Sequence, residues 1–245
     1  MALHIERYGK GKKIIFVHGS GLSTPIWYRL RDYLAPFIEV VLIDLPGHGR
    51  SPGNGYDSIE GYRDAIFNTI KGSDLEGCYM AGHSLGGAIA MSFAIAYPEM
   101  IKGLILLGTG ARLKVLPQIL EGILSNKEET LKQIIKFAFS DKTDEGLVEI
   151  HYHETSKCPE EIVYRDFYAC DRFNIMDRLD VISSPTLILC GRDDKLTPPK
   201  YAEYLNSRIK NSELIIIEDA GHMLMLEKPE EVGIAIKGFV EKQPG

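Results

Sequence analysis

Residues 78–98, CYMAGHSLGGAIAMSFAIAYP, combine a short apolar run, a glycine-framed turn and a long apolar segment with helical spacing. The first part is typical of a buried β-strand and the last part of a helix that is buried on most sides. This pattern leaves Ser84 on the turn, where crowding forces the backbone towards positive φ. Gly82 and Gly86 remove side chains where strand, turn and helix approach one another. We therefore expect the Ser84 hydroxyl to stand above the sheet, at the amino end of a helix.

Strand and helix signals alternate along most of the chain. Continuously apolar runs that are rich in β-branched residues occur at residues 14–17, 40–45, 78–82, 104–108, 185–190 and 214–217. Such runs are typical of parallel strands that are covered on both faces. Helical patterns separate them, and residues 3–8 favour an edge strand. The sequence therefore predicts an α/β fold, a mostly parallel, doubly wound sheet with helices on both faces.

The alternation stops between residues 111 and 179, where no buried-strand signal occurs. Apolar residues at helical spacing predict amphipathic helices in this segment. Two such faces are Leu116/Ile119/Ile123 and Leu131/Ile135/Ala138, and Pro159 opens a further helix. We expect residues 1–110 and 180–245 to form the core, with 111–179 inserted as a helical cap. The apolar faces of the cap are expected to be buried on the rim of the sheet.

The charge balance and the cysteines indicate which partners and compartment to expect. A net charge of −6 over 245 residues gives no electrostatic reason to expect nucleic acid or an anionic membrane as a partner. No apolar run approaches membrane-spanning length, and the N-terminal residues MALHIERYGKGKK lack the apolar core of a secretory signal. The four cysteines form no C-x-x-C pair, so we expect them to be reduced. These features predict a cytoplasmic monomer or small homo-oligomer.

Three polar residues follow predicted strands and can meet at one edge of the sheet. Ser84, Asp194 and His222 each come directly after an apolar run, and the carboxyl ends of parallel strands share one rim. A serine hydroxyl is a poor nucleophile unless a base takes its proton and a third group orients that base. The three residues predict such an arrangement, although the neighbouring Asp193 is an alternative acid at this point.

Five motifs resemble those of the α/β-hydrolase superfamily. They are HGSG at 18–21, DLPGHGRS at 44–51, GHSLGG at 82–87, PTLILCGRDDKLTP at 185–198 and AGH at 220–222. The resemblance covers essentially the whole chain and is weakest in the helical insertion, which corresponds to the family's cap. It is closest to carboxylesterase-like serine hydrolases, whose site residues occur in the order Ser, Asp, His.

The resemblance implies a role for each site residue. Ser84 would be the nucleophile, His222 the general base, and Asp194 the acid, because the family's usual G-x-x-D spacing starts here at Gly191. The backbone N–H groups of Ser20 and Leu85 would form the oxyanion hole. The histidines at 151 and 153 would point in different directions on a helix, so we expect no metal site.

The activity implied by the resemblance is hydrolysis of small to medium carboxylic esters through an acyl-enzyme intermediate, without a cofactor. Hydrolysis of carbon–carbon bonds in diketone-like compounds uses the same three residues and is the alternative. A ligand receptor with slow or incidental hydrolysis is a third interpretation, from a different functional class. The cap and the pocket, which the motifs do not describe, decide between these substrates.

Overall fold

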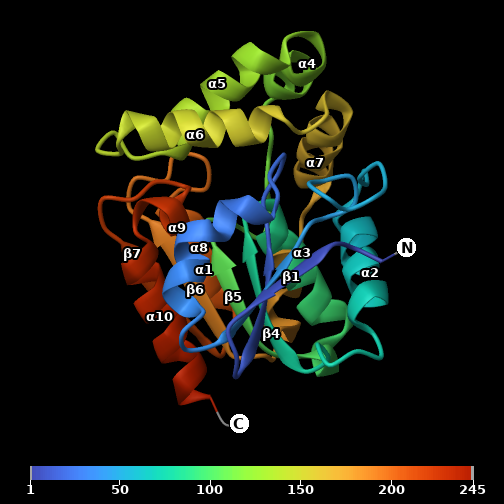
Figure 1. The fold of residues 1–245 in the computed structure, drawn as a ribbon, viewed down its shortest axis with the longest axis vertical. Helices are drawn as coiled ribbons and strands as arrows, with labels where there is room; N and C mark the ends of the chain where they lie inside the picture. Colours follow the sequence, from blue (N-terminus) through green and yellow to red (C-terminus); the bar gives the residue numbers. More distant parts are fainter. Residues whose placement is uncertain (1, 244–245) are drawn as a thin grey trace.

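The computed structural model describes residues 2–243 and contains a seven-stranded sheet with the strand order β1-β3-β2-β4-β5-β6-β7 (Figure 1). The strands are β1 (Ile5–Tyr8), β2 (Lys13–Val17), β3 (Glu39–Ile43), β4 (Cys78–His83), β5 (Ile101–Leu107), β6 (Thr186–Gly191) and β7 (Ser212–Ile217). Only β1, at one edge, runs antiparallel to its neighbour. The predicted α/β fold with a mostly parallel sheet is therefore confirmed.

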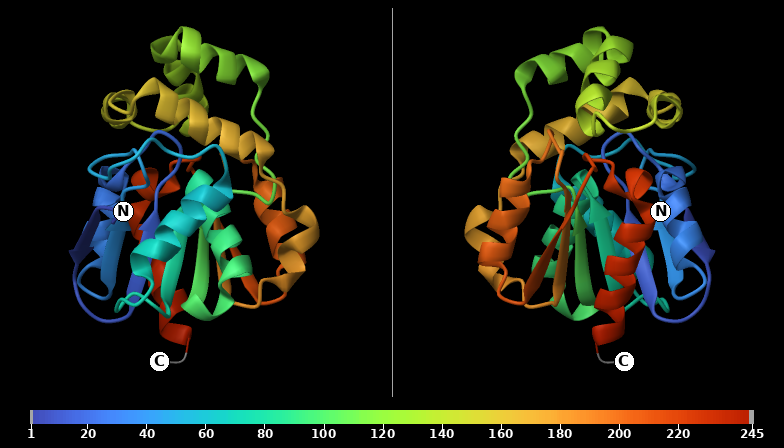
Figure 2. Two further views of the ribbon diagram at one scale, coloured as in Figure 1. Left: turned by 90° about the vertical axis from the view of Figure 1, so that its right-hand side faces the viewer. Right: turned by 90° about the vertical axis from the view of Figure 1, so that its left-hand side faces the viewer.

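Helices cover both faces of the sheet (Figure 2). One face carries α2 (Ile59–Ile70), α3 (Leu85–Ala96) and α8 (Pro199–Arg208), and the other carries α1 (Tyr28–Leu34) and α10 (Pro229–Lys242). Short helical turns lie at η1 (Thr24–Trp27), η2 (Pro98–Met100), η3 (Met176–Val181) and α9 (Leu224–Glu227). Alternate residues of β2 enter the two opposite cores, Ile15 one and Phe16 the other. This explains why the central strands are apolar without interruption.

The segment between β5 and β6 lies above the carboxyl ends of the strands (Figure 1). It contains α4 (Pro117–Ser125), α5 (Lys127–Ala138), α6 (Glu145–Ser156) and α7 (Glu160–Arg172). The chain leaves and returns at one point, because Arg112 and Asn174 form an antiparallel bridge beside a hydrogen bond from the Ile175 N–H to the Ala111 carbonyl, 2.9 Å long. These helices are therefore an insertion at a single point of the sheet's rim.

The expectation that the apolar faces of this insertion are buried is correct only in part. Ile123 on α4 is fully buried, but Leu116, directly before this helix, and Leu124 on it are 68% and 51% exposed. The reason is that α4 packs on α5 and α7 and lies at the far end of the molecule from the sheet. Among residues 2–243 no helix has both the length and the hydropathy to span a bilayer.

The turn between β4 and α3 has no room for side chains on its glycines. A Cβ atom on Gly82 would lie 2.1 Å from the carbonyl oxygen of Gly86, and one on Gly86 would lie 2.2 Å from the carbonyl oxygen of Val17. Both obstacles are backbone atoms of the sheet or helix, which cannot rotate away. The start of α3 is therefore held directly against β2 and β4.

We expect Gly82→Ala to destabilise the fold by about 3 kcal/mol or more, because the new methyl group must displace backbone. Urea denaturation, followed by circular dichroism, measures the change in the free energy of unfolding. Gly238→Ala on α10 is the matched control, since a Cβ there meets nothing within 4 Å. That control should be neutral or slightly stabilising, because alanine favours helix over glycine. Equal stability of the two variants would contradict the tight packing of the turn.

Candidate active site

Every residue from Cys78 to Ala94 is buried except Ser84. Its backbone is held at φ 53° and ψ −115°. The Ser84 N–H donates to the Leu107 carbonyl over 3.0 Å, and the Thr109 hydroxyl donates to the Ser84 carbonyl over 2.8 Å. Strand β5 thus supports the strained turn, and the serine hydroxyl points out of the packed core.

His222 is held by a buried carboxylate. Its Nδ1 donates to Asp194 Oδ2 over 2.9 Å, so Nε2 is the nitrogen that can accept a proton when the ring is neutral. The other oxygen, Asp194 Oδ1, accepts the N–H groups of Leu196 and Thr197, each at 2.8 Å, and the Thr197 hydroxyl donates to Oδ2. Burial raises the pKa of Asp194, but His222 and the Thr197 hydrogen bonds outweigh this and leave the pKa below 3.8. Asp194 is therefore a carboxylate at neutral pH.

The neighbouring Asp193 is directed elsewhere. Its Oδ2 accepts the hydroxyl proton of Ser140 over 2.5 Å, and its backbone N–H donates to the Ala220 carbonyl. The geometry therefore brings Asp194, and not Asp193, together with His222. Sequence spacing alone left the choice between the two open.

Two backbone N–H groups beside Ser84 have no hydrogen-bond acceptor among the described residues, those of Ser20 and Leu85. Leu85 is the first residue of α3, so no carbonyl of its own helix is available to it. The loop that carries Ser20 is braced by His18, whose Nδ1 donates to the Gly19 carbonyl while Nε2 accepts the Leu45 N–H at 3.0 Å. Both N–H groups are free to bind a ligand oxygen.

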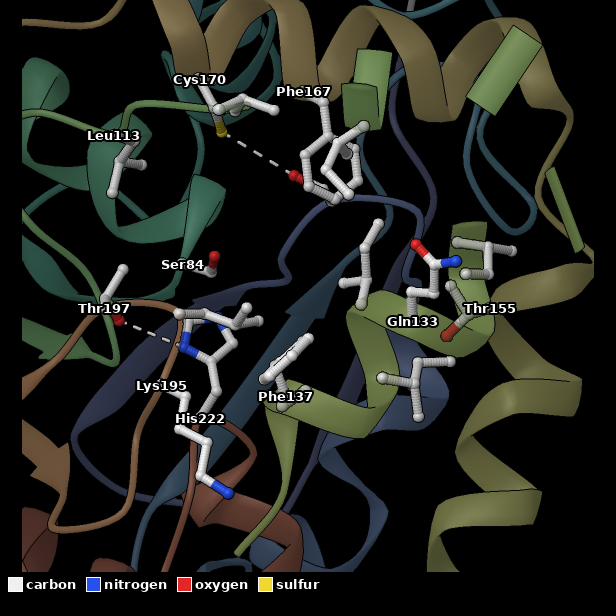
Figure 3. Close-up of a pocket in the computed structure, with 18 of the residues that line it drawn as sticks. Ser84, Leu113, Gln133, Phe137, Thr155, Phe167, Cys170, Lys195, Thr197 and His222 are labelled. Carbon is white, nitrogen blue, oxygen red and sulfur yellow. Dashed lines mark hydrogen bonds between the residues drawn. The ribbon is translucent and has the colours of Figure 1, made fainter. Parts of the chain in front are cut away.

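A cavity of about 770 Å³ contains both Ser84 and His222, between the rim of the sheet and the inserted helices. Figure 3 shows Phe167 and Cys170 projecting from α7 towards the part of the cavity that holds Ser84, with Phe137 beside His222. Most of the lining is apolar. No hydrogen bond joins Ser84 to His222 within residues 2–243. This contact is often long in enzymes without substrate.

His83 is buried in the wall of the cavity and supports the backbone of His222. Its Nε2 donates to the carbonyl of His222 over 3.0 Å, while Nδ1 is buried without a partner. Burial, and then the neighbouring His222, lower the pKa of His83 well below 6.5. The ring is therefore neutral, and it fixes the backbone that carries His222.

Asp166 on α7 is a fully buried carboxylate that the sequence analysis missed. Its Oδ2 accepts the Gly21 N–H and His48 Nε2, each at 2.8 Å, and its Oδ1 accepts the Tyr62 hydroxyl. Burial lowers the pKa of His48, but the adjacent carboxylate outweighs it and holds the pKa well above 6.5. The buried ion pair therefore ties α7 to the loop after β3 that carries His48, and the Gly21 N–H ties it to the loop that carries Ser20.

A signal for this residue exists in the sequence. Asp166 lies on the apolar face of α7, three residues after Val163 and three before Ala169, both of which are buried. A carboxylate on an apolar face needs buried donors, because an unpaired buried charge is costly.

Glu227 has a similar role beside His222 and has no such signal in the sequence. Its Oε2 accepts the Gly221 N–H over 2.8 Å, and Oε1 accepts the Ser140 N–H and the Thr143 hydroxyl. It therefore joins the loop before His222 to the residues that follow α5.

The histidines at 151 and 153 do not converge. His151 is buried, whereas the His153 side chain is 66% exposed and faces Glu149. Over the described part of the chain, no group of three or more His, Cys, Asp or Glu side chains is arranged to hold a metal ion.

Comparisons with known proteins agree with this fold. The sequence model of the alpha/beta hydrolase family matches residues 14–233. A solved structure described as a thermophilic esterase superposes with a TM-score of 0.85 at 34% identity, covering 98% of each chain.

Two curated relatives carry names of different activities. A 2-hydroxy-6-oxo-6-phenylhexa-2,4-dienoate hydrolase from Comamonas testosteroni is 29% identical over 94% of this chain and 87% of its own. A pimeloyl-[acyl-carrier protein] methyl ester esterase from Neisseria meningitidis is 28% identical over 94% of each chain.

We expect His48→Gln to destabilise the fold by about 3 kcal/mol at pH 6, because it leaves the buried Asp166 without its cation. Since the folded-state pKa of His48 is raised, this contribution is complete below about pH 6.5 and is lost as pH rises towards the folded-state value. The difference from wild type should therefore shrink between pH 6.5 and 9, by at most about 1.4 kcal/mol per pH unit.

Urea denaturation of both proteins across this pH range gives the measurement. His153→Gln, at the exposed histidine, is the control and should change stability little at any pH. A His48→Gln difference that stays constant from pH 6 to 9 would mean that His48 is neutral in the folded protein.

Proposed function

The chain belongs to the α/β-hydrolase family, and we propose that it is a serine hydrolase that cleaves small to medium carboxylic esters. The observation that carries the proposal is the cavity that Ser84 and His222 both line, with Asp194 hydrogen-bonded to His222. The unpaired N–H groups of Ser20 and Leu85 support it, because a carbonyl oxygen that becomes negative needs such donors.

Each of these residues then has a defined role in the reaction. Ser84 Oγ attacks the ester carbonyl carbon while His222 Nε2 takes the hydroxyl proton, and the carbonyl electron pair moves to the oxygen that Ser20 and Leu85 bind. When the intermediate collapses, the bond to the alcohol oxygen breaks and His222 returns the proton to that oxygen. Water then attacks the acyl-enzyme carbonyl while His222 Nε2 takes one of its protons. As this second intermediate collapses, the bond between the acyl carbon and Ser84 Oγ breaks, His222 returns the proton to Oγ, and the acid is released. Asp194 keeps the proton of His222 on Nδ1 and stabilises the ring when it is charged.

We propose further that residues 111–179 form a cap that selects the substrate. Two large apolar side chains of this segment, Leu116 and Phe137, are 68% and 50% exposed and line the same cavity as Ser84, as does Leu196 of the core. An apolar lining favours uncharged acyl chains, and each methylene that fits strengthens binding by about 0.8 kcal/mol. The cavity volume of about 770 Å³ limits the chain length.

Carbon–carbon bond hydrolysis of a diketone-like compound is the second candidate. The Comamonas testosteroni relative is named as a hydrolase of a 2-hydroxy-6-oxo-dienoate. In its keto form, such a compound is a vinylogous diketone. The same nucleophile and base would serve in that reaction. A receptor with slow, incidental hydrolysis is the third, and it would give a single turnover.

A panel of p-nitrophenyl esters with graded acyl chains tests the ester proposal. We expect steady turnover of short to medium chains, which rises with each added methylene and falls once the cavity is full. Ser84→Ala should lower kcat by about 10⁴- to 10⁶-fold, and a fluorophosphonate should label wild type but not this variant. Rapid cleavage of a vinylogous diketone without ester turnover would favour the second candidate, and a trapped adduct after one turnover the receptor.

A pair of neighbouring substitutions tests the acid. Asp194→Asn should lower kcat by about 10³- to 10⁴-fold, because the amide favours the wrong tautomer of His222. Asp193→Asn should have a far smaller effect, since Asp193 contacts Ser140. Steady-state kinetics on one ester at pH 8 compares them. The reverse order of the two effects would show that Asp194 is not the catalytic acid.

A further inference from the structure

His151 on α6 is a buried polar side chain that the proposed reaction does not use. It is 5% exposed and lines the same cavity as Ser84 and His222. Its Nδ1 is buried without a hydrogen-bond partner, and no hydrogen bond is formed by Nε2 in the part of the chain that the structure describes. Buried polar atoms in folded proteins nearly always have a partner, so an unpaired ring at a cavity wall indicates a missing ligand or water.

The ring of His151 is neutral. Burial, and then the nearby His222, lower its pKa to about 4. A neutral imidazole carries its proton on one nitrogen only, and a buried N–H without an acceptor is rarer than a bare acceptor. His83 is an example in this protein, because its Nε2 donates while its Nδ1 is buried unpaired. By the same reasoning His151 carries its proton on Nε2, which is not among the buried atoms without a partner in the described part of the chain and so is open at the cavity wall that His151 lines.

Among the described residues, no group on α6 accepts a hydrogen bond from the ring of His151. Thr155, one turn further along α6, donates its hydroxyl to the His151 carbonyl over 2.9 Å. On another side the ring of Phe139 packs edge-on, with the ring centroids 5.3 Å apart. His151 therefore presents one hydrogen-bond donor to the cavity beside two neighbours that offer none, the apolar Phe139 and the already bonded Thr155.

We propose that Nε2 of His151 donates a hydrogen bond to a second, uncharged acceptor oxygen of the substrate, a keto oxygen in the acyl chain. The inference rests on the proposed ester hydrolysis and names a substrate class for it, oxo-acyl esters. A carboxylate fits less well, because a neutral ring supplies no charge to compensate its burial. A purely aliphatic chain would leave the donor unpaired, which costs binding energy.

Three p-nitrophenyl esters of equal chain length test this: hexanoate, 4-oxohexanoate and 5-oxohexanoate. We expect wild type to prefer one oxo ester over hexanoate by about five- to tenfold in kcat/KM, the range for one neutral hydrogen bond. His151→Phe should abolish that preference while hexanoate is still hydrolysed. His151→Gln, whose amide N–H replaces Nε2–H, should restore part of it. His153→Phe makes the same change at an exposed position of α6 and should alter neither rate nor preference.

A binding measurement separates this inference from the proposed reaction. In a Ser84→Ala background, calorimetry gives the affinities for methyl hexanoate and the methyl oxohexanoates without turnover. Adding His151→Phe should remove the preference for the oxo ester there as well. If esters turn over but His151→Phe keeps the oxo preference, the inference is wrong and the ester proposal stands. If no ester turns over, the ester proposal fails, and equal affinities in the Ser84→Ala background overturn the inference independently.

Discussion

The contact of backbone with backbone at the turn between β4 and α3 is the constraint on which the site depends. Because Gly82 and Gly86 have no Cβ, the first turn of α3 lies against the carbonyl groups at the end of β2 and forces Ser84 to positive φ. Everything else at the rim is arranged around that fixed point. β5 supports the turn from one side, and the loop after β2 places Ser20 on the other. The position of a single hydroxyl is therefore determined by main-chain packing, which tolerates little displacement.

The loops around this point are fixed by two buried acidic side chains and a half-buried one, which bind backbone N–H groups. Asp44 accepts the N–H groups of Thr24 and Arg50, Asp166 accepts that of Gly21, and Glu227 accepts those of Ser140 and Gly221. Irregular loops have no ladder partners for their donors, so these carboxylates satisfy them instead. Since Asp166 and Ser140 belong to the insertion, the same bonds couple the inserted helices to the loops that carry Ser20 and His222. A shift of these helices would therefore reach the site through hydrogen bonds as well as through packing.

The histidines of the site divide into charged and neutral rings according to their partners. His48 faces the carboxylate of Asp166 and carries a proton, whereas His18, His83 and His151 are buried without a carboxylate and have lowered pKa values. Neutral rings around His222 add no positive charge that would oppose its protonation during a reaction. His83 and His151 line the cavity without adding charge to its mostly apolar wall.

The sequence by itself determined the sheet, the place of Ser84 on its turn, and the strand ends at which Asp194 and His222 lie. These follow from local periodicity and from the rule that parallel strands end at one rim. The choice of Asp194 over Asp193 rested on resemblance until the fold directed one side chain to His222 and the other to Ser140. Only the tertiary structure revealed Asp166, Glu227 and the unpaired His151, because their partners lie far away in the sequence. It also left Leu116 exposed at the cavity, where periodicity predicted burial. Periodicity states which face of a helix is apolar, whereas packing decides whether a core, a cavity or solvent lies opposite.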